Sequence, residues 1–287
     1  MEAITRVGVV GLGTMGAGIA QVLLEGGCAV VGHEVDDLAL ERARDRIERG
    51  LARRVEKGVR SDDERRAALA RLTLVRELPD LRDCQLVIEA ISDDLAAKRA
   101  LFAALDATCA PGAVLATNTS AISVTAIAAG SARPERCLGL HFFNPAPLMP
   151  LVEVVRAELT GEGPYAAAVA LVSACGKQPV RCNDTPGFVV NRLLVPALND
   201  AVRALDELGI EPAEIDAAMT AGAGWPMGPF RLIDLIGIDV HVHAAEALHG
   251  ALSEPRMAPP PRLRRMLDAG LLGRKTGRGF YDYGEPG

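Results

Sequence analysis

Short apolar runs alternate with stretches of helical periodicity along the first 183 residues, and this alternation constrains the fold more than any other feature. The apolar runs are predicted to be strands at 6–11, 29–33, 72–75, 85–90, 113–118, 137–143, 151–156 and 178–182. Helical patterns separate most of them, at 14–25, 37–57, 61–71, 93–108 and 164–175. Strands that alternate with helices form a mostly parallel sheet covered on both faces. We therefore predict an α/β, Rossmann-type doubly wound fold.

The pattern changes at the sequence NDTPGF, residues 183–188, where Asp, Pro and Gly mark a break. Beyond it we predict no strand before the last few residues. Residues 188–208 are predicted to form a long helix that is apolar on several sides, and such a helix is usually buried by other helices or by a second subunit. The sequence therefore predicts an α/β domain over residues 1–184 and a smaller, all-helical domain over 185–287.

Composition narrows the class of protein. The net charge of −6 argues against a nucleic-acid-binding protein. No apolar run reaches the ~18 residues that a membrane span needs, and the first ten residues lack the pattern of a signal peptide. The cysteines are scattered without metal-like spacing, which favours reduced thiols in a cytoplasmic protein and no metal site; they lie at positions 28, 84, 109, 137, 175 and 182.

The sequence GLGTMG follows the first predicted strand and opens the first predicted helix. Its glycines are Gly11, Gly13 and Gly16, with Thr14 and Met15 between the last two. In a G-x-G-x-x-G turn the first glycine makes the tight turn, the second lets the backbone approach a pyrophosphate, and the third lets helix and strand pack closely. The free N–H groups of the helix N-terminus then bind the phosphates. The motif alone is weak, but this context predicts a dinucleotide site.

Glu34 indicates which dinucleotide is bound. It ends the second predicted strand, 18 residues after Gly16. A carboxylate at this place accepts a hydrogen bond from the ribose 2′-hydroxyl of NAD and repels a 2′-phosphate. Residues 35–37 offer no arginine to hold such a phosphate. We therefore expect NAD as the cofactor.

His141 is the candidate general base for a hydride transfer to NAD, because it ends a predicted strand, where the sites of α/β proteins lie. Spacing alone leaves a satisfied core histidine equally plausible. Glu153, a single carboxylate within an apolar predicted strand, needs a partner, and His141 is a candidate. His241 and His243 stand two residues apart on a predicted helix, so they do not share a face for a metal ion.

Seven motifs stand in one order along the whole chain: VGVVGLGTMGAGIAQ, IEAI, TNTSAI, GLHFFNPAPLMPLVEVV, DTPGFVVNRLLVP, GAGWPMGPF and GRKTGRGFYDY. In these motifs the chain resembles the L-3-hydroxyacyl-CoA dehydrogenase family. The resemblance implies an oxidoreductase of fatty acid metabolism that reversibly oxidises L-3-hydroxyacyl-CoA to 3-ketoacyl-CoA with NAD, and short substrates such as 3-hydroxybutyryl-CoA are expected. Two alternatives stay open: a dehydrogenase of a free hydroxy or sugar acid such as L-gulonate, like lambda-crystallin relatives, and an NAD-binding protein without turnover.

The resemblance also implies roles for individual residues. His141 and Glu153 match the family's catalytic dyad, in which the carboxylate orients the imidazole. Ser120, in TNTS, matches a serine that meets both substrate and nicotinamide. Asn191, in PGFVVNR, matches an asparagine that positions the substrate. These matches make a proton-abstracting centre the expected core of the site.

Further matches concern the cofactor. Lys98, Asn144 and Lys275 stand where the family contacts NAD. Lys98 and Asn144 also have simpler readings, as a solvated helix residue and a turn former. Asp93 stands where the family commonly has glutamate, and its shorter side chain puts that contact in doubt.

Residues 42–60 carry eight basic and three acidic side chains, a local charge of +5. On charge alone, a solvated helical face explains them almost as well as an anion site. The resemblance implies that Lys57, with Arg54 nearby, binds the coenzyme A phosphate. Gly50 stands where the family has a serine, so part of this contact set is expected to differ. The apolar surface of residues 188–208, in a helical half too small to bury it all, predicts a homodimer formed through residues 185–287.

Overall fold

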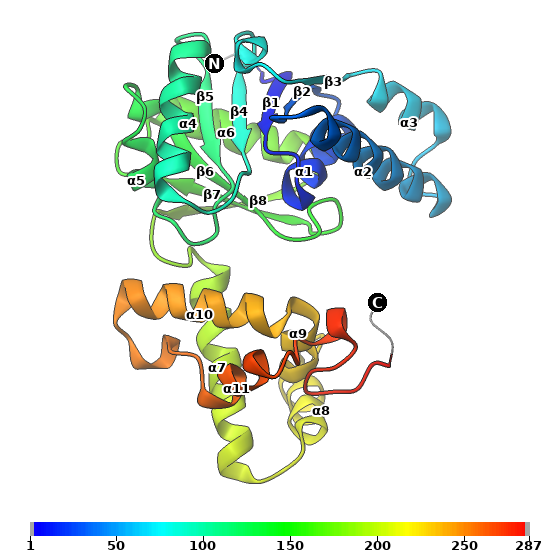
Figure 1. The fold of residues 1–287 in the computed structure, drawn as a ribbon, viewed down its shortest axis with the longest axis vertical. Coiled ribbons are helices and arrows are strands. Elements are labelled where there is room, and N and C mark those ends of the chain that lie inside the picture. Colours follow the sequence, from blue (N-terminus) through cyan, green and yellow to red (C-terminus); the bar gives the residue numbers. More distant parts are fainter. Residues whose placement is uncertain (1–2, 285–287) are drawn as a thin grey trace. The chain divides into compact units, whose positions relative to one another are not determined.

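The structure is a computed structural model that describes residues 3–284. The chain divides into two compact units, Met1–Thr185 and Pro186–Gly287 (Figure 1). The first unit contains the sheet, and the second is helical. Each unit has buried apolar clusters of its own.

One eight-stranded sheet in the order β3-β2-β1-β4-β5-β6-β7-β8 forms the first unit. Its strands are β1 (Arg6–Val10), β2 (Ala29–His33), β3 (Leu72–Val75), β4 (Leu86–Glu89), β5 (Val114–Thr117), β6 (Cys137–Phe142), β7 (Leu151–Arg156) and β8 (Gln178–Asn183). All neighbouring strands are parallel except β6 and β7. Residues 143–150 join these two, and a connection this short cannot make the crossover that a parallel pair needs. The predicted mostly parallel sheet is confirmed.

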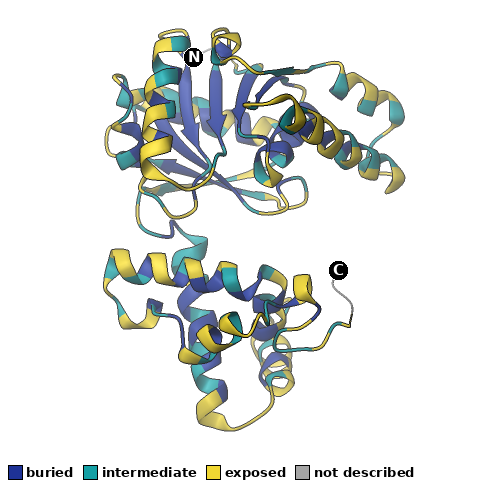
Figure 2. Cartoon of the chain, in the orientation of Figure 1, coloured by how far each residue is buried: buried dark blue, intermediate teal, exposed yellow. Residues whose placement is uncertain are grey.

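Helices cover both faces of this sheet. On one face α1 (Thr14–Glu25), α2 (Asp37–Glu56) and α6 (Glu162–Ala174) join one apolar cluster, and on the other α4 (Leu95–Thr108) and α5 (Val124–Ala128) join a second. In β4, Leu86 and Ile88 lie in the first cluster and Val87 in the second. Strands buried on both faces need continuous apolar runs, which is the pattern seen in the sequence (Figure 2). The remaining helix, α3 (Asp62–Leu69), follows α2.

Helix α5 is absent from the sequence prediction because a distant residue stabilises its start. Its N-cap residue, Ser123, bonds to the Ala126 N–H. The Asp184 carboxylate also accepts hydrogen bonds from the backbone N–H groups of Val124 and Thr125, at 3.0 and 2.7 Å. Local sequence contains only the first of these caps.

The second unit contains α7 (Val190–Leu208), α8 (Pro212–Ala223), α9 (Pro229–Ile236), α10 (Ile238–Leu252) and α11 (Pro261–Asp268). Helix α7 is uninterrupted and includes Pro196. The core of the unit gathers around α7, α9 and α10, with Leu198, Phe230 and Val242 buried. Its only strand-like pairings among the described residues are two isolated bridges. Within residues 3–284 no helix has the length and apolar character to cross a membrane.

Candidate active site

The glycine turn between β1 and α1 has the geometry that a dinucleotide requires. Gly11 has φ +83°, in the left-handed region that favours glycine. A Cβ on Gly16 would lie 1.8 Å from the carbonyl oxygen of Gly11, so only glycine permits this close approach. Around Gly13 a Cβ would meet nothing within 4 Å, which leaves room for a phosphate beside the N-terminus of α1. Thr14 and Met15 form the first turn of that helix.

Glu34 follows β2 and contacts the same turn. Its Oε1 accepts a hydrogen bond from the backbone N–H of Leu12 at 2.5 Å. A residue missed by the sequence analysis, Arg46 of α2, donates to the carbonyl oxygen of Leu12 at 3.1 Å. The Glu34 carboxylate is thus held at the glycine turn, and an arginine approaches this turn from a helix rather than from residues 35–37.

At the end of β4 lies a second carboxylate that the sequence analysis did not single out, Glu89, which is fully buried. It forms an ion pair with Lys98, whose Nζ lies 2.8 and 2.9 Å from its two oxygens. Lys98 is therefore buried, not solvated, and its Nζ also lies 3.3 Å from Oδ1 of the exposed Asp93. The signal that could have found Glu89 is the one that marked Glu153: a lone carboxylate in an apolar strand.

His141 and Glu153 face each other across the antiparallel pair β6–β7, where they are direct partners in the register. Nδ1 of His141 lies 2.6 Å from Oε2 of Glu153. Glu153 is fully buried and His141 is 6% exposed, so their charges are shielded little by water. With Nδ1 donating to the carboxylate, the neutral ring is held in the tautomer whose Nε2 carries the basic lone pair.

Near this pair, burial raises the pKa of the Cys182 thiol to about 12, and the negative charge of Glu153 adds to the rise. A thiol in this state stays protonated at neutral pH. Of the two neighbouring groups, His141 with Glu153 is therefore a better-placed base than the Cys182 thiol.

Ser120 lies exposed on the loop that follows β5. Asn118, two residues earlier, accepts a hydrogen bond from the backbone N–H of Phe142 at 2.9 Å. This bond ties the serine loop to the end of β6, beside His141. Asn144 lies exposed in the β6–β7 connection, three residues beyond His141. The first unit thus places His141 near the end of β6, and Ser120 and Asn144 on the loops that follow β5 and β6.

The positions predicted to contact the coenzyme A phosphate differ in their surroundings. Arg54 of α2 approaches Glu25 of α1, with Nε 3.4 Å from Oε2, whereas Lys57 is exposed at the end of α2. A Cβ on Gly50 would lie 2.2 Å from Oε1 of Gln21, so this side chain occupies the space that a serine would need. Of the predicted contact set, Lys57 alone is both exposed and not paired with a carboxylate among the described residues.

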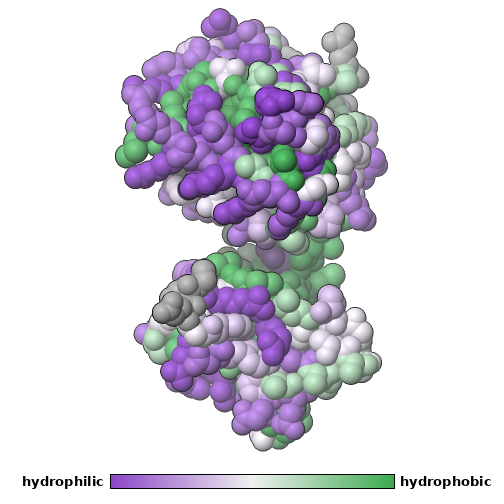
Figure 3. Space-filling model, turned by 90° about the vertical axis from the view of Figure 1, so that its right-hand side faces the viewer, coloured by the Kyte–Doolittle hydropathy of each residue, from purple (hydrophilic) through white to green (hydrophobic). Residues whose placement is uncertain are grey.

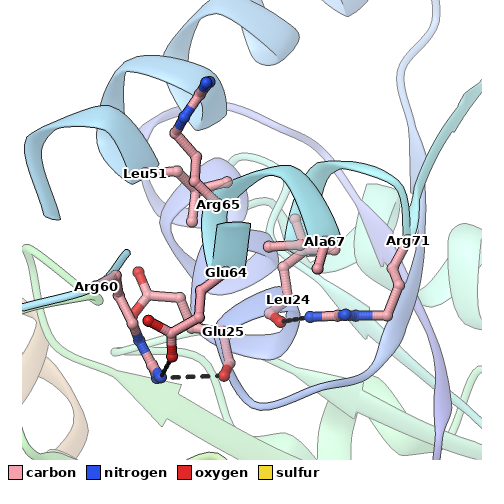
Figure 4. A pocket seen from close by; sticks show the side chains of 9 residues that line it. Leu24, Glu25, Leu51, Arg60, Glu64, Arg65, Ala67 and Arg71 are labelled. Carbon is pink, nitrogen blue, oxygen red and sulfur yellow. Dashed lines mark hydrogen bonds and ion pairs between the residues drawn. The ribbon is translucent and has the colours of Figure 1, made fainter. Parts of the chain in front are cut away.

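Beside this region, a pocket lies between α1, α2 and α3 (Figure 4). Arg60 extends toward Glu25 and Glu64, at 3.8 and 2.9 Å. Arg71 donates to the carbonyl oxygen of Leu24 at 2.7 Å. Arg60, like Arg54, is paired with carboxylates of the same unit, so part of the +5 charge of residues 42–60 is neutralised internally. Arg71 bonds only a neutral carbonyl group.

Two predicted residues lie in the helical unit. Asn191 is half-buried in the first turn of α7. Lys275 is exposed and forms an ion pair with Asp239 of α10 at 2.5 Å. Burial favours a raised pKa for the Asp239 carboxyl, but the hydrogen bond and charge of Lys275, with backbone N–H groups, outweigh it and lower the pKa.

Comparison with known proteins identifies the family of this chain. Residues 6–185 match the NAD binding domain of 3-hydroxyacyl-CoA dehydrogenase, and residues 187–283 match its C-terminal domain. The chain belongs to the 3-hydroxyacyl-CoA dehydrogenase family. It is therefore an NAD-dependent oxidoreductase that acts on a CH–OH group.

Relatives of this family align with nearly the whole chain. A 3-hydroxybutyryl-CoA dehydrogenase of Mycobacterium tuberculosis is 47% identical over 98% of this chain and 99% of its own length. The 3-hydroxyadipyl-CoA dehydrogenase of Escherichia coli is 45% identical over 99% of this chain and 60% of its own. The crystal structure of (S)-3-hydroxybutyryl-CoA dehydrogenase from Ralstonia eutropha superposes with a TM-score of 0.94 at 38% identity, covering 99% of this chain and 100% of that one.

Proposed function

We propose that this dehydrogenase reversibly oxidises short-chain L-3-hydroxyacyl-CoA, such as 3-hydroxybutyryl-CoA, to the 3-ketoacyl-CoA. The observation that carries the proposal is the 2.6 Å contact between His141 and Glu153, in the sheet whose glycine turn fits NAD. Full-length relatives named for 3-hydroxybutyryl-CoA support the short chain.

His141 is the base of this reaction. Its Nε2 takes the proton of the 3-hydroxyl group while the C3–H bond breaks, and Glu153 stabilises the imidazolium that forms. When bound, NAD accepts the hydride from C3. In the reverse direction the imidazolium returns the proton to the oxygen of the 3-keto group.

Other residues orient the substrate and cofactor. We assign Ser120 and Asn191 to the substrate, and Glu34, Asp93, Asn144 and Lys275 to NAD. Lys98 is buried against Glu89, so it acts on the NAD site only through the loop that it holds. We assign the coenzyme A phosphate to Lys57, with Arg54 in a lesser role because it already pairs with Glu25. Each assignment is tested by the Michaelis constant for the ligand concerned in the corresponding alanine variant.

The decisive experiment is a panel of substrates with NADH. We expect the highest kcat/KM with acetoacetyl-CoA, lower values with longer chains and with 3-ketoadipyl-CoA, and none with 3-dehydro-L-gulonate, the oxidised form of the free acid. If only the free acid is turned over, the protein is instead a dehydrogenase of a free acid. If no acyl-CoA substrate supports NADH oxidation, the protein binds NAD without turnover.

We also propose that the protein is a cytoplasmic homodimer. Exposed apolar side chains on the helical unit support the dimer (Figure 3); they are Leu193, Leu208, Ile210, Leu235 and Val240. The six free cysteines support a reducing compartment. Cell fractionation tests the location.

A further inference from the structure

We propose that Glu89 is a positioning residue that braces two loops at the cofactor edge of the sheet. The proposal rests on the proposed function, because it concerns how the groups of that reaction are held. Glu89 is the last residue of β4, at the centre of the sheet between β1 and β5. A fully buried carboxylate is costly unless hydrogen bonds satisfy it, so its partners show what it holds.

The first partner is Lys98, which fixes the loop between β4 and α4. Its ammonium bonds to both oxygens of Glu89 and also to the carbonyl oxygen of Ile91 at 3.2 Å. Ala90, the first residue of this loop, packs against the glycine turn: a Cβ on Gly11 would lie 2.9 Å from its carbonyl oxygen. Glu89 thus acts through Lys98 on the loop beside the predicted pyrophosphate site.

The second partner is Thr117, which fixes the loop that carries Ser120. The Thr117 hydroxyl donates to Glu89 and accepts from the backbone N–H of Thr119 at 3.2 Å. The Thr119 hydroxyl accepts in turn from the N–H of Ile122 at 3.1 Å. Ser120 therefore lies on a loop that is tied to Glu89, while Asn118 ties the same loop to the strand of His141.

A purely structural ion pair is the alternative, and it makes a different prediction. When one member of a buried ion pair is removed, the other remains as an uncompensated charge. Replacing both members by uncharged groups of similar size often leaves the stability intact. The double variant Glu89→Gln/Lys98→Met therefore separates the two roles. A structural pair restores both stability and function in the double variant, whereas a positioning pair restores stability alone.

The first measurement is the affinity of each variant for NADH, by fluorescence titration, beside a thermal melt. We expect Glu89→Gln to lower the melting temperature, the double variant to melt near wild type, and both to bind NADH roughly 10-fold more weakly, as the loss of a charged hydrogen bond implies. A double variant with wild-type stability, NADH affinity and kcat would overturn the proposal.

The second measurement uses Thr117, which keeps the experiment decisive even where the Glu89 variants do not fold. Thr117→Val keeps the shape of the side chain but removes the hydroxyl, and Thr117→Ser keeps the hydroxyl as a matched control. We expect Thr117→Val to lower kcat with acetoacetyl-CoA about 10-fold, with little change in NADH affinity, and the serine variant to act like wild type. Equal kcat in the valine and serine variants would refute the brace on the serine loop.

Failure of the proposed function has a separate signature. If the wild-type protein turns over no acyl-CoA substrate, the reaction is wrong, yet the NADH affinities still report whether Glu89 positions the cofactor loop. If the wild-type protein is active and the variants match it in affinity and kcat, only the positioning role of Glu89 fails.

Discussion

At the scale of single residues, we propose that His141 and Glu153 act as one catalytic unit, because their side chains are in contact at 2.6 Å. Losses from residues that act as a unit do not add. We expect His141→Gln to lower kcat roughly 10²- to 10⁴-fold, Glu153→Gln to cost a similar order, and the double variant to be little worse than the poorer single one.

Stopped-flow turnover checks this prediction, with a thermal melt and NADH titration as controls. NADH affinity stays near wild type in each variant because the glycine turn and Glu34 hold the cofactor. A folded His141→Gln enzyme with wild-type kcat would reduce the dyad to a structural ion pair.

At the same scale, we propose that Glu34 determines the choice of cofactor. Loss of its charged hydrogen bond costs ~1.5–3 kcal/mol, so Glu34→Ala weakens NADH binding roughly 10- to 150-fold. NADPH binding changes less, because the variant removes the repulsion of a 2′-phosphate and Arg46 lies at the same turn. Titration of both nucleotides decides: equal wild-type kcat/KM for NADH and NADPH would contradict this role.

At the scale of elements, Asp184 stabilises the start of α5. Its two oxygens accept from the N–H groups of Val124 and Thr125 and from the Ser123 hydroxyl. We expect Asp184→Ala to lower the free energy of unfolding by ~2 kcal/mol, as the loss of a helix cap and charged hydrogen bonds implies. Urea denaturation measures the effect, and Asp184→Asn, which keeps an acceptor oxygen, loses less. Wild-type stability in the alanine variant would show that α5 needs no distant cap.

A buried contact joins two helices of the second unit and makes its stability depend on pH. His241 of α10 lies 2.9 Å from Oδ1 of Asn199 in α7, and burial lowers the pKa of His241 to about 4. The unfolded chain binds a proton below its ordinary pKa of about 6.5, but the folded chain does not until pH reaches about 4. The free energy of unfolding therefore falls by roughly 3 kcal/mol in total as the pH drops from about 6.5 to about 4.

Chemical denaturation at several pH values measures this slope. His241→Gln keeps a hydrogen-bond donor for Asn199 but does not titrate, so its unfolding free energy loses this part of the pH dependence. His243→Gln, at an exposed position on the same helix, is the matched control and retains the slope. An identical slope in both variants would remove His241 as the cause.

At the scale of the whole molecule, apolar surface on the helical unit predicts a homodimer. Leu193 of α7 is 68% exposed. Large exposed apolar surface often marks a place where another protein chain binds. We expect light scattering at micromolar concentration to give a dimer, and Leu193→Arg to shift it toward monomer. Leu38→Arg on α2, 54% exposed, serves as the control and leaves the dimer intact. A monomeric wild-type protein would contradict the prediction.

Sequence alone determined the features that depend on local pattern. Continuous apolar runs such as 85–90 predict strands buried on both faces, and Gly11, Gly13 and Gly16 predict the turn, because period and backbone freedom are local properties. The sequence marked His141 and Glu153 separately as unusual residues in apolar strands. The cost of a buried carboxylate made His141 a candidate partner of Glu153, and the resemblance then identified the two as a dyad before the structure did.

Tertiary structure decided the contacts that join distant segments. The antiparallel register of β6 and β7 places Nδ1 of His141 2.6 Å from Glu153, and Asp184 caps a helix 60 residues earlier in the chain. Lys98 is another example. The sequence was compatible with a solvated lysine on a helix, but the fold buries Lys98 against Glu89. Buried charges must find partners wherever the chain brings them, and that requirement can be met only once the strands are aligned.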